Sequence, residues 1–231
     1  MNFNRQAALA TLTLCALGSA QAVTVNHVIS LNSNEIALQM SDWGPEALLL
    51  PQFDASLGTL DSVAITLVGN LAGSAKAENK NNGAAQVTLN LQATLTLVDP
   101  LGGATLVQTT SLVSNSFAAT TYDLIDDYSG TSGVAYLNLT GQSSVTSLTF
   151  TDGATLVRFT GNGTVGTQLT ALGQSGYESS ANLKTSFRTS AGGYASVTYA
   201  YHTTAVPEPG TWALMFAGLG MIGLLASRRS A

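Results

Sequence analysis

Gln86–Val98 reads QVTLNLQATLTLV, and from Gln86 to Leu97 polar and apolar residues alternate without interruption. Because successive side chains of a β-strand point to opposite faces, this period of two predicts a strand with one buried face and one solvent-exposed face. The turn sequence DPLGG follows at Asp99–Gly103, and a second strand is expected over Ala104–Val113. We therefore predict a β-hairpin in this part of the chain.

Similar short segments occur throughout residues 23–205, separated by turns rich in Gly, Asn and Ser. The further predicted strands are 62–68, 134–139, 145–150, 154–159, 164–172, 183–188 and 194–202. Helix is expected only as a single turn at residues 44–48, and residues 74–83 are expected to form an exposed loop. Many short strands joined by turns are typical of an antiparallel β-sandwich and not of alternating β/α units. We predict an all-β domain over residues 23–205.

Residues 1–22 have the three parts of a secretory signal peptide. Arg5 supplies the positive charge, Ala7–Leu17 the apolar region and Ala20–Ala22 the small-x-small site for signal peptidase. Cleavage there would make Val23 the first residue of the exported protein. Cys15 is the sole cysteine and lies within the removed segment, so the exported domain is expected to have no disulfide and no thiolate.

The C-terminal residues 206–231 combine a short proline motif, an apolar run and a pair of arginines. The motif is Pro207-Glu208-Pro209, in which the prolines hold Glu208 in an extended, accessible backbone. Residues 211–227 carry no charge and are long enough for one transmembrane helix. Arg228 and Arg229 follow, and their charge is expected to stop transfer on the cytoplasmic side.

This pattern resembles the PEP-CTERM sorting signal of Gram-negative bacteria, which is processed by membrane proteases of the exosortase family. The resemblance implies an inner-membrane-anchored intermediate, an exosortase as partner, and a final location at the cell surface or in the extracellular matrix. Such signals tend to accompany exopolysaccharide production, so a structural role in biofilm or envelope is expected. Similar tails occur on proteins described as ice-binding.

Leu50–Leu60, LPQFDASLGTL, and the closing Val197–Tyr201, VTYAY, resemble the choice-of-anchor E domains, which are β-rich and exported. That family has no assigned chemistry, so the resemblance implies fold and export and adds no catalytic residue. Within this stretch we expect Phe53 and Leu57 to close one end of the sandwich.

Charge and composition exclude several function classes. Residues 23–205 contain five basic and twelve acidic residues, a net charge of −7, which is unsuited to nucleic acid or anionic lipid. His27 and His202 are the only histidines, and no Gly-x-Ser-x-Gly motif occurs. We assign no catalytic residue and predict that the protein is not an enzyme, with a hydrolase as the third hypothesis. The histidines are interpreted as surface imidazoles, with a two-histidine metal site as the alternative.

Asp123, Asp126 and Asp127 form the sole acidic cluster. Clustered carboxylates can bind Ca²⁺, but the spacing does not match a helix-loop-helix calcium loop, so a solvated loop is the competing interpretation. No other cofactor is predicted.

The C-terminal part of the domain is the most aromatic. Its rings are Phe187, Tyr177, Tyr194, Tyr199 and Tyr201. Exposed tyrosines could stack on sugars, whereas buried ones would form cross-strand packing pairs. A glycan-binding module is therefore the alternative to a structural surface protein. Ice binding is a weaker alternative, because the threonines show no fixed repeat.

Overall fold

The computed structural model describes residues 23–205, 216, 218–220, 222 and 227. The chain divides into two compact units, Asn26–Thr203 and a second unit of residues 1–25 and 204–231. The predicted transmembrane segment falls mainly outside the described residues, although the six that are described there are helical. Within the described residues, no helix is long and apolar enough to cross a membrane.

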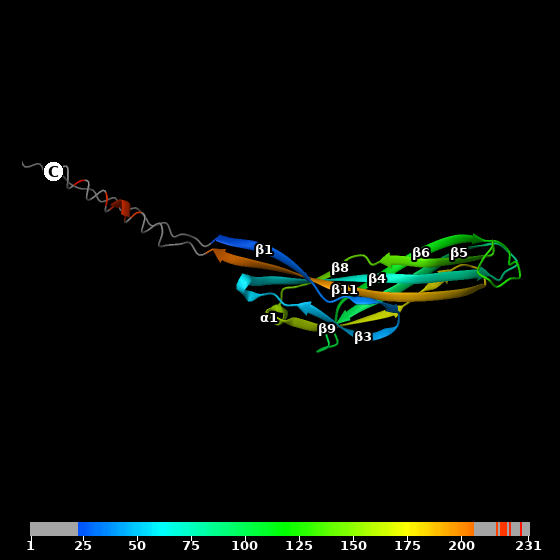
Figure 1. Cartoon of the computed structure of the whole chain (residues 1–231), viewed down its shortest axis with the longest axis horizontal. Helices are drawn as coiled ribbons and strands as arrows, with labels where there is room; N and C mark the ends of the chain where they lie inside the picture. Colours follow the sequence, from blue (N-terminus) through cyan, green and yellow to red (C-terminus); the bar gives the residue numbers. More distant parts are fainter. Residues whose placement is uncertain (1–22, 206–215, 217, 221, 223–226, 228–231) are drawn as a thin grey trace, which may run out of the picture. The chain divides into compact units, whose positions relative to one another are not determined.

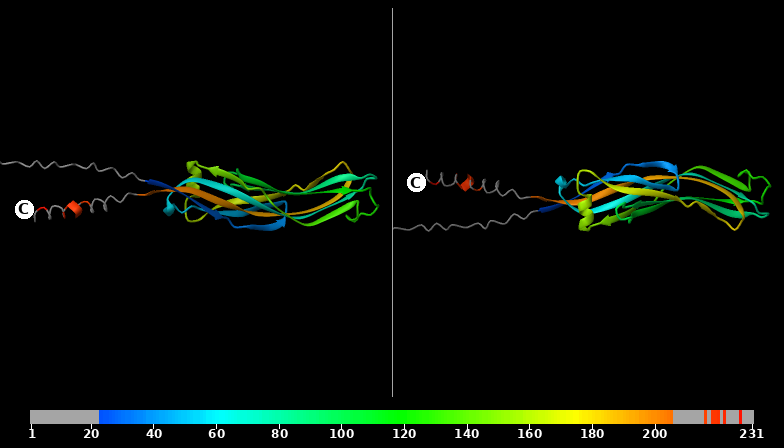
Figure 2. Two further views of the ribbon diagram at one scale, coloured as in Figure 1. Left: turned by 90° about the horizontal axis from the view of Figure 1, so that it is seen from above. Right: turned by 90° about the horizontal axis from the view of Figure 1, so that it is seen from below.

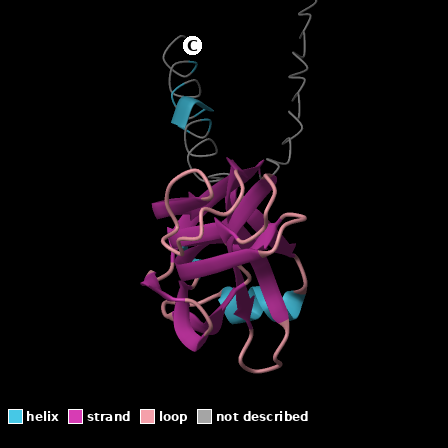
Figure 3. Cartoon of the chain, turned by 90° about the vertical axis from the view of Figure 1, so that its right-hand side faces the viewer, coloured by secondary structure: helices cyan, strands magenta, loops and turns pink. Residues whose placement is uncertain are grey.

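The first unit consists of two antiparallel sheets (Figures 1 and 3). The six-stranded sheet contains β1 (Val23–Asn32), β2 (Ile36–Met40), β4 (Thr59–Asn79), β7 (Gly133–Gln142), β8 (Thr146–Phe150) and β11 (Leu183–Ala205). Its order is β1-β11-β4-β7, with β2 paired to β11 and β8 paired to β4. The five-stranded sheet contains β3 (Trp43–Pro51), β5 (Ala85–Val98), β6 (Thr105–Ala119), β9 (Thr164–Gly173) and β10 (Gly176–Glu178). Its order is β10-β5-β9-β3, with β6 paired to β5. The predicted all-β sandwich is confirmed.

The predicted hairpin is the β5–β6 pair. Its register runs from Ala85 opposite Ala119 to Val98 opposite Thr105. The odd-numbered residues of β5 from Val87 to Leu97 are all buried, with at most 1% exposure. The even-numbered residues lie on the outer face of the sheet, as the alternation predicts.

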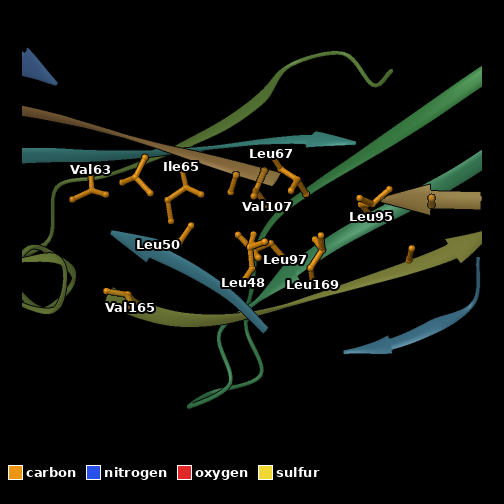
Figure 4. Packing of buried hydrophobic residues seen from close by; sticks show 14 of the residues in the cluster. Leu48, Leu50, Val63, Ile65, Leu67, Leu95, Leu97, Val107, Val165 and Leu169 are labelled. Atoms are coloured by element: carbon orange, nitrogen blue, oxygen red, sulfur yellow. The ribbon is translucent and has the colours of Figure 1, made fainter. Parts of the chain in front are cut away.

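The core lies between the inner faces of the two sheets. Figure 4 shows Val63, Ile65 and Leu67 of β4 pointing toward Leu48 and Leu50 of β3 and toward the leucines of β5. Each of these side chains is fully buried, and burial of one such side chain contributes about 1.5–3 kcal/mol to stability. A second cluster, Ala75, Ala77, Val87, Leu89 and Ala119, packs β4 against the β5–β6 hairpin.

Gly69 of β4 provides a polar connection between the sheets. Its carbonyl oxygen accepts a hydrogen bond from Ser111 Oγ of β6 (3.0 Å), and its N–H donates to Ser143 Oγ (2.9 Å). The two serines are buried but satisfied by these bonds, so they add little desolvation cost to the interior.

β4 and β11 are much longer than the sequence predicts, and both run along the length of the unit (Figure 2). The predicted exposed loop over residues 74–83 is confirmed only for residues 80–83, because β4 continues to Asn79 and buries Ala75 and Ala77 against the hairpin. The Gly-rich residues 191–193, expected as a turn between the predicted strands 183–188 and 194–202, instead pair with β4 within the continuous β11.

Two other local predictions are wrong. Residues 154–159 form the helix α1 (Gly153–Phe159) and not a strand, because Asp152 caps it by accepting the Thr155 N–H (2.9 Å). Residues 44–48 lie in β3 and not in a helical turn. At the end of the sandwich Phe53 is buried as predicted, whereas Leu57 is 40% exposed in a 3₁₀ turn, η1 (Ala55–Leu57).

Leu95→Ala should lower the free energy of unfolding by about 2–5 kcal/mol, because it opens a cavity in a fully buried site. The matched control is Leu112→Ala on β6, where the leucine is 52% exposed and the cost should stay below about 1 kcal/mol. Denaturant unfolding followed by circular dichroism measures both, and equal losses would contradict the packing described here.

Candidate functional site

The acidic cluster lies in the loop between β6 and β7. Asp126 is the most constrained of its carboxylates. It forms an ion pair with Lys80, lies 3.3 Å from the Lys184 Nζ and accepts a hydrogen bond from the Tyr122 hydroxyl (2.9 Å). Lys80 and the Tyr122 hydroxyl, together with Lys184, lower the pKa of Asp126 to about 2. The contacts of Lys80 with Asp126 and with Tyr122 raise the pKa of Lys80.

Asp123 and Asp127 have local roles in the loop. Asp123 accepts the N–H of Ile125 and Asp127 accepts the N–H of Ser129, each at 2.9 Å. Each carboxylate thus accepts the backbone N–H two residues further along the chain and stabilises a turn there. The three aspartates that the sequence groups together therefore have three separate sets of partners.

Glu78, on β4, is a buried carboxylate that the sequence analysis missed. Its Oε2 accepts the N–H of Tyr128 in the same loop (2.9 Å). Its Oε1 and the Ser132 Oγ are the buried side-chain atoms without a hydrogen-bond partner among the described residues. Lys184 is its cross-strand neighbour on β11, and Gly133 is its neighbour on β7. A Cβ at Gly133 would collide with Oε2, so glycine leaves room for this carboxylate.

Glu78 was missed because residues 74–83 were interpreted as a loop. The apolar residues at positions 75 and 77 continue the alternation of β4, and they are the signal that could have placed Glu78 within a strand. Within the described part of the chain, no group of three or more His, Cys, Asp or Glu side chains is placed to hold a metal ion. The calcium hypothesis stays a prediction.

The two histidines have different partners near the other end of the domain. His27 stacks on Tyr201, with ring centroids 5.1 Å apart, and its Nε2 lies 3.3 Å from Thr203 Oγ1. His202 Nδ1 lies 2.7 Å from Asp61 Oδ1. Each set of contacts holds a partly exposed imidazole in place on the sheet.

Most of the aromatic residues take part in packing. Tyr199 is fully buried, its hydroxyl donates to the Pro51 carbonyl oxygen, and burial raises the pKa of Tyr199. The ring of Phe53 lies 5.6 Å from that of Tyr199 and 5.0 Å from that of Tyr201. Among the five aromatic residues singled out in the sequence, Tyr177 alone is exposed. These rings therefore do not form a shared platform for sugars.

Two shallow grooves indent the domain. One, of about 550 Å³, is lined by residues that include Met40, Gly73, Leu137, Asn138 and Arg188. The other, of about 510 Å³, lies beside α1 and is lined by residues that include Phe53, Leu60 and Leu156. Neither lining includes a histidine or a carboxylate, so neither groove presents an acid–base pair.

Comparison with known families identifies the C-terminal segment. Residues 205–230 match the family described as "PEP-CTERM protein-sorting motif". The chain thus carries an exosortase sorting signal, which implies export, a membrane-anchored intermediate and processing by an exosortase. This segment contains Pro207, Glu208, Pro209, Arg228 and Arg229, which lie outside the described residues. The predicted signal peptide, residues 1–22, also lies outside the described residues. The resemblance to choice-of-anchor E domains is not confirmed.

No curated protein matches the chain. Among solved structures, the chain is similar to those titled "Structure of infectious bursal disease virus Gx strain" and "Structure of infectious bursal disease virus Gt strain". Each is 12% identical, with a TM-score of 0.14. The alignments cover 87% of this chain and 49% and 48% of those chains, so the chain spans about half their length.

Asp126→Asn tests the ion pairs of the loop. Because the folded pKa of Asp126 lies below the ordinary value of 3.8, its stabilising effect is complete above about pH 4 and is lost toward about pH 2. The unfolding free energy of the parent should therefore fall more steeply across this window than that of the variant. Asp123→Asn, which removes a carboxylate bonded only within its loop, should follow the parent; three parallel curves would contradict the assignment.

Calcium binding is tested by thermal unfolding with Ca²⁺ or with a chelator. Because Asp123, Asp126 and Asp127 already have separate partners, we expect the melting temperature to be the same in both conditions. A saturable rise with calcium that is lost in the Asp126→Asn/Asp127→Asn double variant would show that the loop binds the ion.

Proposed function

We propose that the protein is a non-enzymatic structural component of the cell surface or extracellular matrix, associated with exopolysaccharide or biofilm. The observation that carries this proposal is the sorting motif at residues 205–230, which follows directly after the last strand of the sandwich. The domain itself supports a structural role, since its two sheets pack through extensive apolar clusters and its grooves present no acid–base pair.

The route to that location has three steps. Signal peptidase removes residues 1–22, residues 211–227 hold the exported chain in the inner membrane, and Arg228 and Arg229 stop transfer on the cytoplasmic side. The exosortase then acts at the motif that contains Glu208. The domain reaches the surface or matrix of a Gram-negative bacterium without its anchor.

A second candidate function is a glycan-binding module. The observation in its favour is the outer face of the β5–β6 hairpin, where hydroxyl and amide side chains are paired across the strands and no side chain is charged. This chemistry matches that of uncharged sugars more closely than that of ionic partners. Binding to a glycan would hold the processed protein in the matrix, which is compatible with a structural role.

Glu208→Ala should block processing, because the sequence Pro207-Glu208-Pro209 is expected to present this carboxylate to the protease. We expect a longer form of the protein in the membrane fraction on immunoblots of fractionated cells. The matched control is Glu178→Ala, which removes an exposed carboxylate from β10 and should leave processing unchanged. If the Glu208 variant matured as the parent does, the proposed role of this residue would be wrong.

A further inference from the structure

We propose that the outer face of β5, β6 and β9 binds a neutral polysaccharide; this rests on the proposed function and deepens it. β5 lies between the other two strands, paired with β6 along its whole length and with β9 through residues 93–98. The face is thus formed by three neighbouring strands on the side of the sheet away from the core, with β10 paired to residues 88–90 of β5 at its edge.

The first observation is the absence of charge. None of the residues of β5, β6 and β9 is Asp, Glu, Lys, Arg or His. Soluble surfaces ordinarily carry about 25–35% charged residues. The other sheet has charged residues on its strands, among them Lys76, Lys184 and Arg188. Within the smaller sheet the charged strand residues are Glu46 of β3 and Glu178 of β10, and Glu178 accepts a hydrogen bond from Asn90 Nδ2 at the edge of the face (3.2 Å). The uncharged surface is therefore confined to β5, β6 and β9.

The second observation is a ladder of hydrogen bonds between outward side chains. Thr88 Oγ1 and Ser116 Oγ are 2.7 Å apart, and Thr94 Oγ1 and Thr110 Oγ1 are 3.0 Å apart. Two further rungs join Ser114 to Asn90 (2.7 Å) and Gln108 to Thr96 (2.9 Å). Gln174 extends the ladder beyond β5 by accepting from Thr94 Oγ1 (2.7 Å).

These rungs fix the side chains before any ligand arrives. A hydroxyl offers one donor and two acceptor sites, so a rung with one hydrogen bond retains sites for a partner. Ordering a free Thr or Gln side chain on binding costs affinity, and a pre-formed ladder reduces that cost. Sugar hydroxyls are both donors and acceptors and can use the remaining sites.

The third observation is the placement of two exposed leucines on this face. Leu112 lies opposite Gln92 and Leu172 lies opposite Thr94, so they flank β5 on its two sides. They are 52% and 54% exposed. Neutral sugars present apolar C–H surface as well as hydroxyls, and the leucines provide matching apolar contact within a polar face.

The negative net charge of the domain favours a neutral polysaccharide over an anionic one. With −7 on residues 23–205, the domain repels anionic chains, and the face has no cation to pair with a carboxylate or sulfate. A neutral chain pays no electrostatic penalty on this surface. Its binding should depend little on salt, because no ion pairs form.

The test uses the full chain in a sugar-free, non-ionic detergent, incubated with cellulose, curdlan and cross-linked dextran as neutral probes and with immobilised alginate as an anionic probe. We expect retention on at least one neutral probe, none on alginate, and little change between about 0.05 and 0.5 M NaCl. No retention on any neutral probe, or stronger retention on alginate, would overturn the proposal.

The variant Thr110→Glu/Ser114→Glu places two carboxylates on the exposed face of β6. Retention should fall by about tenfold or more, because each charge would lose water without gaining a partner. The matched control is Ser147→Glu/Thr149→Glu, which adds the same charge at exposed positions of β8 in the other sheet and should bind as the parent does. Circular dichroism verifies that both variants are folded, and equal retention of the two would overturn the assignment of the face.

Fractionation of the producing cells separates the two levels of the proposal. A protein that reaches the surface or matrix but binds no neutral probe overturns the polysaccharide face alone. A protein that is absent from the surface and the matrix overturns the proposed function itself.

Discussion

The antiparallel pairing of β4 with β11 is the constraint on which the rest of the sandwich depends. It joins residues 59–79 to residues 183–202. β1 and β2 attach to β11, and β7 and β8 attach to β4, so the six-stranded sheet is built around this pair. The pairing leaves no room for side chains at two positions: a Cβ at Gly73 or at Gly193 would collide with a backbone carbonyl oxygen of the partner strand. Glycine at these sites is therefore a requirement of the sheet and not a sign of a turn.

A feature of this fold can be predicted from the sequence when the residues that determine it lie close together in the chain. The alternation in Gln86–Val98 is complete within one strand, and it correctly predicts every inward side chain of β5. Residues 74–83 and 191–193 look like loop and turn because they are polar or rich in glycine, yet pairing with distant strands makes residues 74–79 and 191–193 part of the sheet. α1 differs again: its apolar residues fit a strand, and the Asp152 cap favours the helix.

The same is true of the candidate sites: a site made of neighbouring residues can be predicted from the sequence, and a site assembled from distant residues cannot. The sorting motif is contiguous in the chain and is predicted completely from the sequence. The acidic loop is predicted only in part, since its aspartates are adjacent but the lysines that pair with Asp126 come from positions 80 and 184. Glu78 could be placed at this loop only once β4 was known to extend that far. Folding thus brings Glu78, Lys80 and Lys184 to the acidic loop and leaves β5, β6 and β9 of the smaller sheet uncharged.

The position of β11 at the end of the domain sequence has a consequence for biogenesis. A chain that crosses a membrane from its N-terminus delivers β4 long before its partner, which is the last strand to emerge. Until then β4 lacks the neighbour that pairs with it along its length, and β1 and β2 have no strand to join. Because such distant pairing is slow to form, the domain remains open during translocation. The sorting segment begins at residue 205, where β11 ends, so it emerges only after every strand of the domain is available for pairing.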